Sequence, residues 1–441
     1  MEFINSLKEF LTKDEIDKLI RAFNQKEKKG LRVNLHKTTQ IEIKKSFPNL
    51  KSHPFIDYAF IYDEDEYKPG SHPYHLAGLY YIQEPSAMMV THLLDIKEND
   101  KVIDLCAAPG GKSTHALTLL NEDGFLLSND INYTRALELS KNIEKWGCKN
   151  VLVTSTEVST LASNLSGYFD KVILDAPCSG EGMFRKNKLV YEDWSLEKVK
   201  RLSTLQKELI LDAYKLLKKD GIMVYSTCTF EKRENEDVIN HLLKNTNASL
   251  IPIPEHPSFS RGINLKEAIR LYPFKFEGEG HFICLIKCND DYGPIKPLKK
   301  TNKINHNLIL PYLEFEKENL KVKLKGNFKL INNDLYLATS TFLPPTNFKI
   351  LRDGLHLGEI RNKRFIPSHT LALTLKVDEV NQVLNLDYPS TLASNYLQGL
   401  TIPCTYQKGY VLVTINGYNI GWGKASKGIL KNHFPKGLRL S

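Results

Sequence analysis

From about residue 98, short apolar runs alternate with helical stretches, and this alternation limits the fold more than any other feature of the sequence. The runs predict strands at residues 102–105, 125–127, 151–153, 171–174, 222–225 and 281–286. Helical periodicity predicts helices at residues 113–120, 134–146 and 204–217, the last one stopped by Asp220-Gly221. The pattern favours an α/β fold with a Rossmann-like, doubly wound parallel sheet, which binds ligands at the carboxyl ends of its strands.

The segments on either side of this sheet carry mixed helix and strand patterns. The 441 residues suffice for two to three domains at about 150 residues each. Thr12 is the expected N-cap of a first helix, residues 31–35 alternate like a strand, and residues 63–73 read as a loop. We expect four regions, namely an N-terminal α+β subdomain at 1–95, the sheet domain at 96–290, a linker with a small α+β domain at 291–375, and a basic module at 376–441.

Positive charge gathers at the C-terminal end. The formal net charge is +9, and no Asp or Glu follows Asp387. Residues 388–441 hold the cations Lys408, Lys424, Lys427, Lys431, Lys436 and Arg439. Residues 409–423 predict a hairpin that turns at Asn416-Gly417. A folded, acid-free module with aromatic residues suits a phosphate backbone, although a solvated lysine-rich face would have the same composition.

Composition excludes several other classes of protein. Hydrophobic residues make up 41% and charged residues 25% of the chain, which excludes disorder as the main state. The sequence has no apolar run long enough for a transmembrane helix, and its start lacks the pattern of a signal peptide. Seven cysteines without framework spacing fit a reducing cytosol. We therefore expect a cytoplasmic monomer with no membrane partner.

The run Asp-Leu-Cys-Ala-Ala-Pro-Gly-Gly-Lys-Ser-Thr at 104–114 follows the first predicted strand. Its glycines let a ligand approach the backbone, and the helix N-terminus behind it adds partial positive charge. Its Gly-Lys-Ser ending matches a P-loop, but that motif needs Gly where Cys106 stands, and Pro109 removes an N–H. A nucleoside ligand is therefore favoured over a nucleotide. Asp130, after the second strand, can accept hydrogen bonds from ribose hydroxyls, or it can be a helix N-cap.

Two further motifs place a cysteine at the ends of consecutive predicted strands. They are Asp-Ala-Pro-Cys-Ser-Gly-Glu-Gly at 175–182, with Cys178, and Tyr-Ser-Thr-Cys-Thr at 225–229, with Cys228. Because the ends of neighbouring parallel strands share one edge, both thiols could face one cleft. A lone cysteine is usually a small buried hydrophobe, and a reducing compartment opposes a disulfide. We expect no metal site, because the sequence has no Cys-x-x-Cys pair and because Cys284 and Cys288 read as core.

Together these segments resemble the RNA cytosine-C5 methyltransferases of the Nop/Sun family over about residues 30–290. The runs at 104–113, 175–182 and 225–229 are similar to the family's S-adenosylmethionine loop, substrate-cytosine motif and nucleophile motif. Further similar segments are Tyr-Ile-Gln-Glu-Pro-Ser-Ala at 81–87, Arg-Leu-Tyr-Pro at 270–273 and Glu-Gly-His-Phe at 279–282. Phe274 stands where the family often has His, and His281 where it often has Phe. The length and the extra C-terminal module look most like the bacterial RsmF-type 16S ribosomal RNA enzymes, which carry a PUA-like RNA-binding domain.

The resemblance implies a cofactor, a partner and the residues that hold them. The cofactor is S-adenosyl-L-methionine, with contacts expected from Cys106, Ala107, Ala108, Pro109, Gly110, Gly111, Lys112, Asp130, Glu157 and Asp175. Cys228 is the implied nucleophile, and Cys178 is implied in product release. The partner is RNA. Arg185 and Lys186, just after the first cysteine motif, are expected to contact its phosphates, as are Lys424, Lys427 and Lys431, with surface solvation as the alternative.

The chemistry of cytosine gives a reason for the thiol. C5 of the base is a poor nucleophile, and a thiolate that adds at C6 turns C5 into an enamine-like carbon. We expect Lys112 and the sulfonium to favour the thiolate, and Asp175 to stay partly protonated and hydrogen-bond N3 of the base. The expected substrate is 16S ribosomal RNA, with transfer RNA and 23S RNA still open. A non-catalytic RNA-binding scaffold would tolerate loss of Cys228 or Asp175, and both are present.

Overall fold

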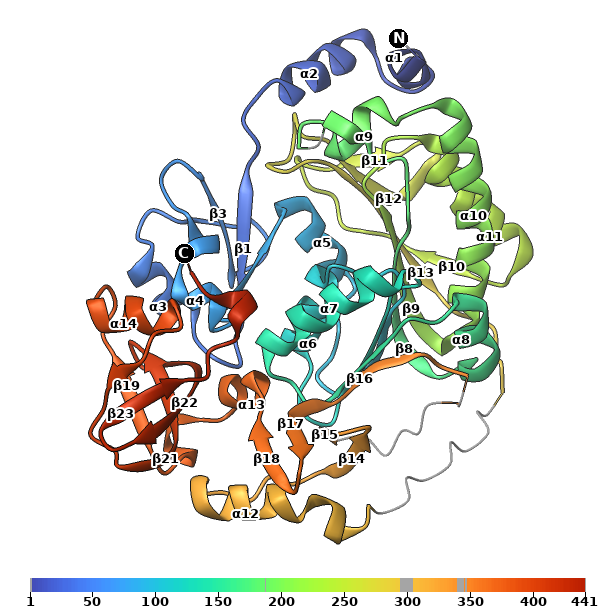
Figure 1. The fold of residues 1–441 in the computed structure, drawn as a ribbon. Coiled ribbons are helices and arrows are strands. Elements are labelled where there is room, and N and C mark those ends of the chain that lie inside the picture. Colours follow the sequence, from blue (N-terminus) through green and yellow to red (C-terminus); the bar gives the residue numbers. More distant parts are fainter. Residues whose placement is uncertain (1, 187, 294–303, 339–344, 346, 441) are drawn as a thin grey trace.

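A large mixed sheet lies at the centre of the molecule, with three smaller sheets around it (Figure 1). The computed structural model describes residues 2–186, 188–293, 304–338, 345 and 347–440. Most of the expected linker, residues 294–303, lies outside the described residues. No helix in the described part of the chain is both long and apolar enough to cross a membrane.

The large sheet confirms the expected doubly wound α/β architecture. Its strand order is β11-β12-β13-β9-β8-β5-β6-β7-β16, and β10 pairs with β13. The parallel centre consists of β5 (Lys101–Asp104), β6 (Phe125–Asn129), β7 (Val151–Thr154), β8 (Phe169–Asp175) and β9 (Leu217–Thr227). The strand β5 lies between β6 and β8, so the chain reverses its direction of winding there. Ligands bind at such a switch point, beyond the carboxyl ends of the strands.

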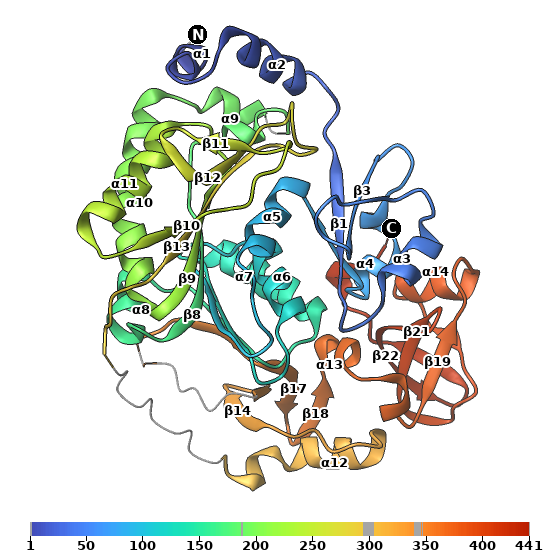
Figure 2. The same ribbon diagram turned by 180° about the vertical axis from the view of Figure 1, so that it is seen from behind.

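Helices cover both faces of this sheet (Figures 1 and 2). One face packs against α5 (Pro85–Leu93), α6 (Gly111–Leu119) and α7 (Tyr133–Trp146). The other face packs against α8 (Val158–Leu165), α10 (Leu196–Lys215) and α11 (Glu236–Asn245). The short helix α9 (Lys188–Glu192) precedes α10. Because the central part of each parallel strand is buried on both faces, its sequence there is a continuous apolar run rather than an alternating one.

One predicted boundary is wrong. The helix expected at 204–217 begins at Leu196 and ends at Lys215, and the strand after it starts at Leu217 rather than at residue 222. Asp220 has a φ of 66°, in the left-handed region, and this conformation lies inside β9 rather than at the end of the helix. The Asp-Gly pair is therefore an irregularity in a strand, which has the same sequence signature as a helix stop.

Antiparallel strands extend the sheet beyond β9. They are β10 (Ser249–Ile251), β11 (Ser260–Gly262), β12 (Leu265–Leu271) and β13 (His281–Lys287). At the opposite edge, β16 (Ile350–Asp353) pairs antiparallel with β7. The C-terminal third of the chain thus contributes a strand to the central sheet, which the sequence did not predict.

The N-terminal region carries its own antiparallel sheet. Its strand order is β2-β3-β1-β4, with β1 at Lys29–Val33, β2 at Lys51–Ser52, β3 at Ala59–Tyr62 and β4 at Tyr80–Gln83. The helices are α1 (Glu2–Leu7), α2 (Lys13–Phe23), α3 (Gln40–Ser46) and α4 (Pro73–Leu76). Thr12 caps α2 in a reciprocal capping box with Glu15, which confirms the predicted helix start.

Two further sheets follow in the C-terminal third. The first contains β14 (Asn327–Ile331), β15 (Asp334–Ala338), β17 (Leu355–Arg361) and β18 (Arg364–Pro367), flanked by α12 (Leu310–Asn319) and α13 (His369–Thr374). The second contains β19 (Val383–Leu386), β20 (Ile402–Pro403), β21 (Lys408–Ile415), β22 (Tyr418–Ser426) and β23 (Ile429–Asn432), with α14 (Thr391–Leu397). Asn416 and Gly417 both have positive φ, which confirms the predicted hairpin.

The last sheet packs against the N-terminal sheet (Figure 1). One apolar core joins buried residues of both, among them Leu31, Tyr80, Tyr396 and Val413. A hydrogen bond of 2.9 Å between the hydroxyls of Thr38 and Tyr418 crosses the same contact. The N-terminal sheet and the last sheet are therefore joined at the side of the central sheet.

Candidate active site

The loop between β5 and α6 forms one wall of the site. Gly110 has a φ of 115°, in the left-handed region that favours glycine. A Cβ on Gly111 would lie 3.2 Å from the side chain of Gln83 and 3.3 Å from Tyr81, so the loop packs closely on the end of β4. Buried Arg32 fixes the following helix by donating to the carbonyl of Gly111 (3.1 Å). Arg32 could not be predicted from the sequence, because its partners on α6 lie 79 to 86 residues further along the chain.

Two carboxyl groups flank this loop. Asp130 is buried and accepts a hydrogen bond from the backbone N–H of Ala108 (3.3 Å). The N-cap of α7 is Asn132 rather than Asp130, which removes the alternative reading of this acid. Asp104, at the end of β5, is fully buried, and burial raises its pKa to about 7. Ser113 donates to one of its oxygens (2.7 Å), and Oδ1 has no hydrogen-bond partner in the described chain.

Asp175 and Lys112 form an ion pair at the strand ends. Lys112 Nζ lies 2.6 Å from Asp175 Oδ2, and the hydroxyl of Ser226 donates to Oδ1 (2.6 Å). Burial acts to raise the pKa of Asp175, but the Lys112 ammonium outweighs it and holds that pKa below its usual range. The expectation that Asp175 is partly protonated is therefore wrong. The carboxylate stays ionised because a buried cation lies against it.

The two cysteine motifs meet at this edge. Cys178 Sγ lies 3.4 Å from Cys228 Sγ, and both thiols are free and half-buried. The adjacent Cys228 and burial raise the pKa of Cys178, so Cys178 holds its proton and can donate it in a hydrogen bond to Cys228. Gly182 makes the approach of the two turns possible. Its N–H donates to the Cys228 carbonyl (2.8 Å), and a Cβ there would lie only 2.9 Å from that oxygen.

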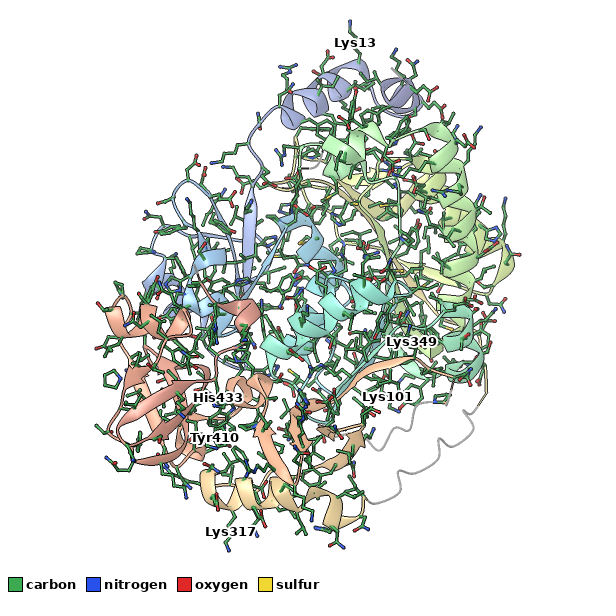
Figure 3. All side chains as sticks on the ribbon, in the orientation of Figure 1. Lys13, Lys101, Lys317, Lys349, Tyr410 and His433 are labelled. Atoms are coloured by element: carbon green, nitrogen blue, oxygen red, sulfur yellow. The ribbon has the colours of Figure 1, made fainter. Side chains whose placement is uncertain are left out.

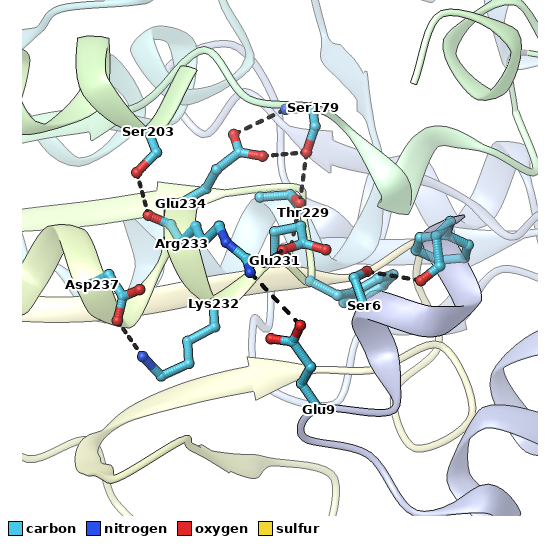
Figure 4. A network of polar contacts seen from close by, with 12 residues as sticks. Ser6, Glu9, Ser179, Ser203, Thr229, Glu231, Lys232, Arg233, Glu234 and Asp237 are labelled. Carbon is cyan, nitrogen blue, oxygen red and sulfur yellow. Dashed lines mark hydrogen bonds and ion pairs between the residues drawn. The ribbon is translucent and has the colours of Figure 1, made fainter. Parts of the chain in front are cut away.

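A buried polar network supports the two cysteine turns (Figure 4). Ser179, next to Cys178, contacts Thr229, next to Cys228, through a hydroxyl pair at 2.9 Å. Ser179 also bonds Glu234 through its hydroxyl, and its N–H donates to the same carboxyl (3.1 Å). Burial raises the pKa of Glu234 to about 7 and that of Glu181, beside it, to about 8. These carboxyl groups tie the residues that follow each cysteine to one another.

The two segments at residues 270–273 and 279–282, which resemble family motifs, lie behind the site. His281 Nδ1 contacts the hydroxyl of Ser86 (2.8 Å), which also donates to Glu84 (2.6 Å). Arg270 forms a buried ion pair with Glu236 (2.6 Å) and donates to the carbonyl of Phe230 (2.7 Å). The motif therefore anchors the 81–87 segment and the turn after Cys228. Phe274, the other departure from the family pattern, stacks on Tyr272 with ring centroids 5.2 Å apart.

The expectation that Arg185 contacts RNA phosphate is wrong. Its side chain is 8% exposed and forms a two-pronged ion pair with Glu279, at 2.7 and 2.9 Å. Its remaining donors reach the carbonyls of Ala22, Lys26 and Gly278. All five N–H groups are thus used inside the protein. Lys186, by contrast, is exposed.

The other predicted residues lie at the edges of the site or far from it. Glu157 is exposed at the start of α8, beyond the carboxyl end of β7. Lys424 and Lys431 are exposed on β22 and β23, and Lys427 is exposed in the turn between them, in a different domain from Cys178 and Cys228. Lys424 lies directly opposite Lys431 in the strand register.

Comparisons with known proteins match the same methyltransferase family over nearly the whole chain. Four family models match: 16S rRNA methyltransferase RsmB/F at residues 91–287, the N-terminal domain of RsmF at 1–85, the first C-terminal domain of RsmF at 314–375 and the RsmF PUA domain at 383–440.

Two relatives share most of this length. Ribosomal RNA small subunit methyltransferase F of Vibrio vulnificus (strain YJ016) is 32% identical over 404 residues, which is 87% of this chain and 84% of that protein. The protein of the same name from Aliivibrio fischeri (strain ATCC 700601 / ES114) is 30% identical over 449 residues, or 96% of this chain and 93% of that protein.

Solved structures from Pyrococcus horikoshii share the central fold. A methyltransferase homologue superimposes with a TM-score of 0.55 at 29% identity, over 65% of this chain and 98% of that chain. NSun6, solved with SFG, superimposes with a TM-score of 0.59 at 21% identity, over 65% of this chain and 98% of that chain, and supports the fold alone.

Proposed function

The chain belongs to the RsmB/F family of 16S ribosomal RNA methyltransferases, and from this premise we propose that it methylates C5 of a cytosine in small-subunit ribosomal RNA. The methyl donor is S-adenosyl-L-methionine, and the reaction passes through a covalent bond between Cys228 and C6 of the base. The observation that carries this proposal is the 3.4 Å contact between the two thiols beside the ion pair of Lys112 and Asp175.

The residues at the β5–α6 loop fit this donor. When bound, S-adenosylmethionine supplies an electrophilic methyl group on a sulfonium sulfur. The free Oδ1 of Asp104 offers an acceptor for a cationic group, and a cation there would favour the ionised carboxylate. The backbone at Gly110 and Gly111 leaves no side chain between the loop and a ligand. Asp130 directly follows β6 and Glu157 lies beyond the carboxyl end of β7, so both would face the ribose and base.

Addition of sulfur to the base needs a thiolate and a way to stabilise the charge that develops. The Lys112 ammonium lies close enough to Cys228 to attract a thiolate there. Because the pKa of Cys178 is raised, its thiol donates a hydrogen bond to that thiolate. By family resemblance Cys228 is the residue that attacks C6, and the C6–S bond forms as the electron pair of the C5–C6 double bond moves toward C5 and the ring nitrogen.

The ionised Asp175 and protonated Lys112 take complementary parts in holding the pyrimidine. Asp175 accepts a hydrogen bond from the exocyclic amino group, and Lys112 donates toward the ring acceptor that gains negative charge. The base must leave its stack to reach these groups. After methyl transfer a base takes the C5 proton, the C5–H electron pair re-forms the C5–C6 double bond, and the C6–S bond breaks so that Cys228 leaves as a thiolate. By family resemblance Cys178 acts in this release.

The function is tested by bisulfite sequencing of ribosomal and transfer RNA from cells with and without the protein, because 5-methylcytosine resists conversion. We expect a protected cytosine in 16S RNA that disappears with the protein and returns with the wild-type gene but not with Cys228→Ala. Protection restored by Cys228→Ala, or a change confined to transfer RNA or 23S RNA, would contradict the proposal. Cytoplasmic location and the monomeric state remain predictions from the sequence.

A further inference from the structure

Buried Glu234 holds the residues on both sides of Cys178. It accepts hydrogen bonds from the backbone N–H of Ser179 (3.1 Å) and from Gln206 Nε2 (2.7 Å). The same nitrogen of Gln206 donates to the carbonyl of Pro177 (2.8 Å). A negative charge on Glu234 therefore lies directly behind the Cys178 turn.

Buried Glu181 holds the turn of the other cysteine. It accepts hydrogen bonds from the backbone N–H of Phe230 (2.7 Å) and from the hydroxyl of Thr229, the residue that follows Cys228. Trp194 Nε1 donates to its other oxygen (2.5 Å). A negative charge on Glu181 therefore lies against the Cys228 turn.

The hydroxyl of Ser179 joins the two carboxyl groups. It lies 2.8 Å from Glu181 Oε1 and contacts Glu234 Oε1 (Figure 4). A serine hydroxyl has one proton and can donate to only one carboxylate, so the other contact needs a proton on the carboxyl group itself. Two ionised carboxylates at one serine would also repel each other. Burial raises the pKa of Glu181 to about 8 and that of Glu234 to about 7, which agrees with one proton held by the pair near neutral pH.

We propose that Glu181 and Glu234 are positioning residues that share one proton through Ser179 and thereby distinguish the two cysteines. With the proton on Glu181, the charge lies on Glu234 and opposes a thiolate at Cys178. With the proton on Glu234, the charge lies on Glu181 and opposes a thiolate at Cys228. Ser179 passes its own proton to one carboxylate as it takes a proton from the other carboxyl group, so no proton enters or leaves the pair. The inference rests on the proposed function, because it concerns which of the two thiols attacks the base.

The charges around the two thiols favour the arrangement with the charge on Glu234. The hydrogen bond to Cys228 and burial raise the pKa of Cys178 most, and the charge of Glu234 raises it further. The Lys112 ammonium acts on the other thiol, since it attracts a thiolate at Cys228. The other ionisable groups that face the pair and the thiols are Asp175, Tyr225, Glu231 and Arg233.

Glutamine variants of the two carboxyl groups test this, because an amide keeps the shape of the side chain and removes its charge. The readout is the alkylation rate of each thiol with iodoacetamide near neutral pH, followed by mass spectrometry of the two cysteine peptides. Only the thiolate reacts, so the rates report which thiol is ionised. In Glu234→Gln any charge of the pair is confined to Glu181, and the rate of Cys228 relative to Cys178 should fall by about ten-fold. In Glu181→Gln the charge is confined to Glu234, and the same ratio should rise by about two-fold or more.

The opposite signs separate this account from a purely structural role. Loss of packing alone would move the ratio in the same direction in both variants, and that result, or an unchanged ratio in both, would overturn the proposal. Glu208→Gln, on the exposed face of α10, is the matched control and should keep the wild-type ratio. Gln206→Leu supplies a second variant if Glu234→Gln does not fold. It removes a donor to Glu234 and shifts the charge toward Glu181, so the ratio should fall by about two- to three-fold. A rise in Gln206→Leu would contradict the proposal.

The alkylation measurement needs neither RNA nor cofactor, so it is independent of the proposed function. In a methyl-transfer assay, Glu234→Gln should lower kcat and leave KM for RNA unchanged, because it alters the thiols and not the RNA contacts. If the wild type transfers no methyl group to cytosine, the proposed function fails, and the alkylation ratios still decide whether the carboxyl pair distinguishes the two cysteines.

Discussion

At the scale of single residues, the site depends on charges that are compensated inside the protein. Lys112 and Asp175 are both mostly buried, and neither would keep its charge there without the other. The sequence predicts that both residues belong to the site. It cannot predict the ionisation of Asp175, because that depends on a distance of 2.6 Å between groups 63 positions apart. The same limit explains why the sequence did not predict the internal ion pair of Arg185, whose partner Glu279 is 94 residues away.

Removing the cation should change the pH dependence of the reaction. In Lys112→Met, burial loses its main opponent, and His281 and the Ser226 hydroxyl are left to lower the pKa of Asp175. That pKa therefore rises, and the ionised form is lost at a higher pH than in the wild type. We expect kcat to fall by about 10² to 10³, with the acidic limb of the profile moved toward neutral pH. Lys101→Met, at the other end of β5, serves as the control (Figure 3). An unmoved acidic limb in Lys112→Met would contradict this account of the ion pair.

Gly182 sets the distance between the two cysteine turns. A methyl group there would meet the carbonyls of Cys228 at 2.9 Å and Gly280 at 3.0 Å, and backbone cannot move aside as a flexible side chain can. Gly182→Ala should therefore lower stability by about 1–3 kcal/mol and reduce methyl transfer more than cofactor binding. Gly437→Ala, where no atom lies within 4 Å, should have neither effect. Urea denaturation, calorimetric titration of the cofactor and a methyl-transfer assay measure the three quantities.

At the scale of elements, the local sequence pattern predicted the parallel strands. It did not predict the pairing of strands that are far apart in the sequence. The predicted helix 134–146 differs from α7 by one residue, because its apolar spacing is regular. The strand β16 was missed because it is short and its partner β7 lies about 200 residues earlier. Its neighbour Lys349 donates a backbone hydrogen bond to Thr156 (3.1 Å), so this strand also holds the turn before Glu157.

The turn between β9 and α11 should make stability depend on pH. Glu234 has a pKa raised by burial from 4.5 to about 7, so the folded state keeps a proton that the unfolded state loses between these values. The free energy of unfolding then falls as pH rises through this window, by up to about 3 kcal/mol from this group. Glu234→Gln mimics the protonated form and should flatten the fall between pH 5 and about 7, as measured by urea denaturation.

Exposed Glu9, also drawn in Figure 4, offers the control for this measurement. Glu9→Gln should retain the wild-type slope with pH. Some slope should also remain in Glu234→Gln, because burial still raises the pKa of Glu181 above its usual value. A Glu234→Gln protein with the full wild-type slope would show that another group carries the dependence.

At the scale of the whole molecule, the N-terminal sheet and the last sheet stabilise each other. The N-terminal and last sheets share one apolar core, so neither can be described as an independent appendage. Tyr418 lies at this contact, where its hydroxyl bonds Thr38 and its ring meets Tyr74 at 5.1 Å. Charge composition predicted a basic C-terminal module but gave no sign of where it would dock, because that contact is apolar.

Truncating Tyr418 should therefore destabilise the N-terminal sheet and the last sheet together. In Tyr418→Ala we expect faster amide hydrogen exchange in β1 and β3 as well as in β21 and β22, because the shared core loses a large ring. Tyr67→Ala, which removes a ring from the N-terminal side only, should affect the first pair of strands more than the second. Faster exchange in Tyr418→Ala confined to the last sheet would show that the two sheets are not coupled.

The most direct test of the central claim is covalent trapping with 16S RNA that contains 5-azacytidine, followed by denaturing electrophoresis and mass spectrometry of the linked peptide. The two-thiol site predicts an adduct in the wild type and in Cys178→Ala, attached at Cys228, and none in Cys228→Ala. An adduct that persists in Cys228→Ala and disappears in Cys178→Ala would reverse the roles of the two cysteines. A wild-type protein that methylates the RNA yet never traps it would contradict the covalent mechanism itself.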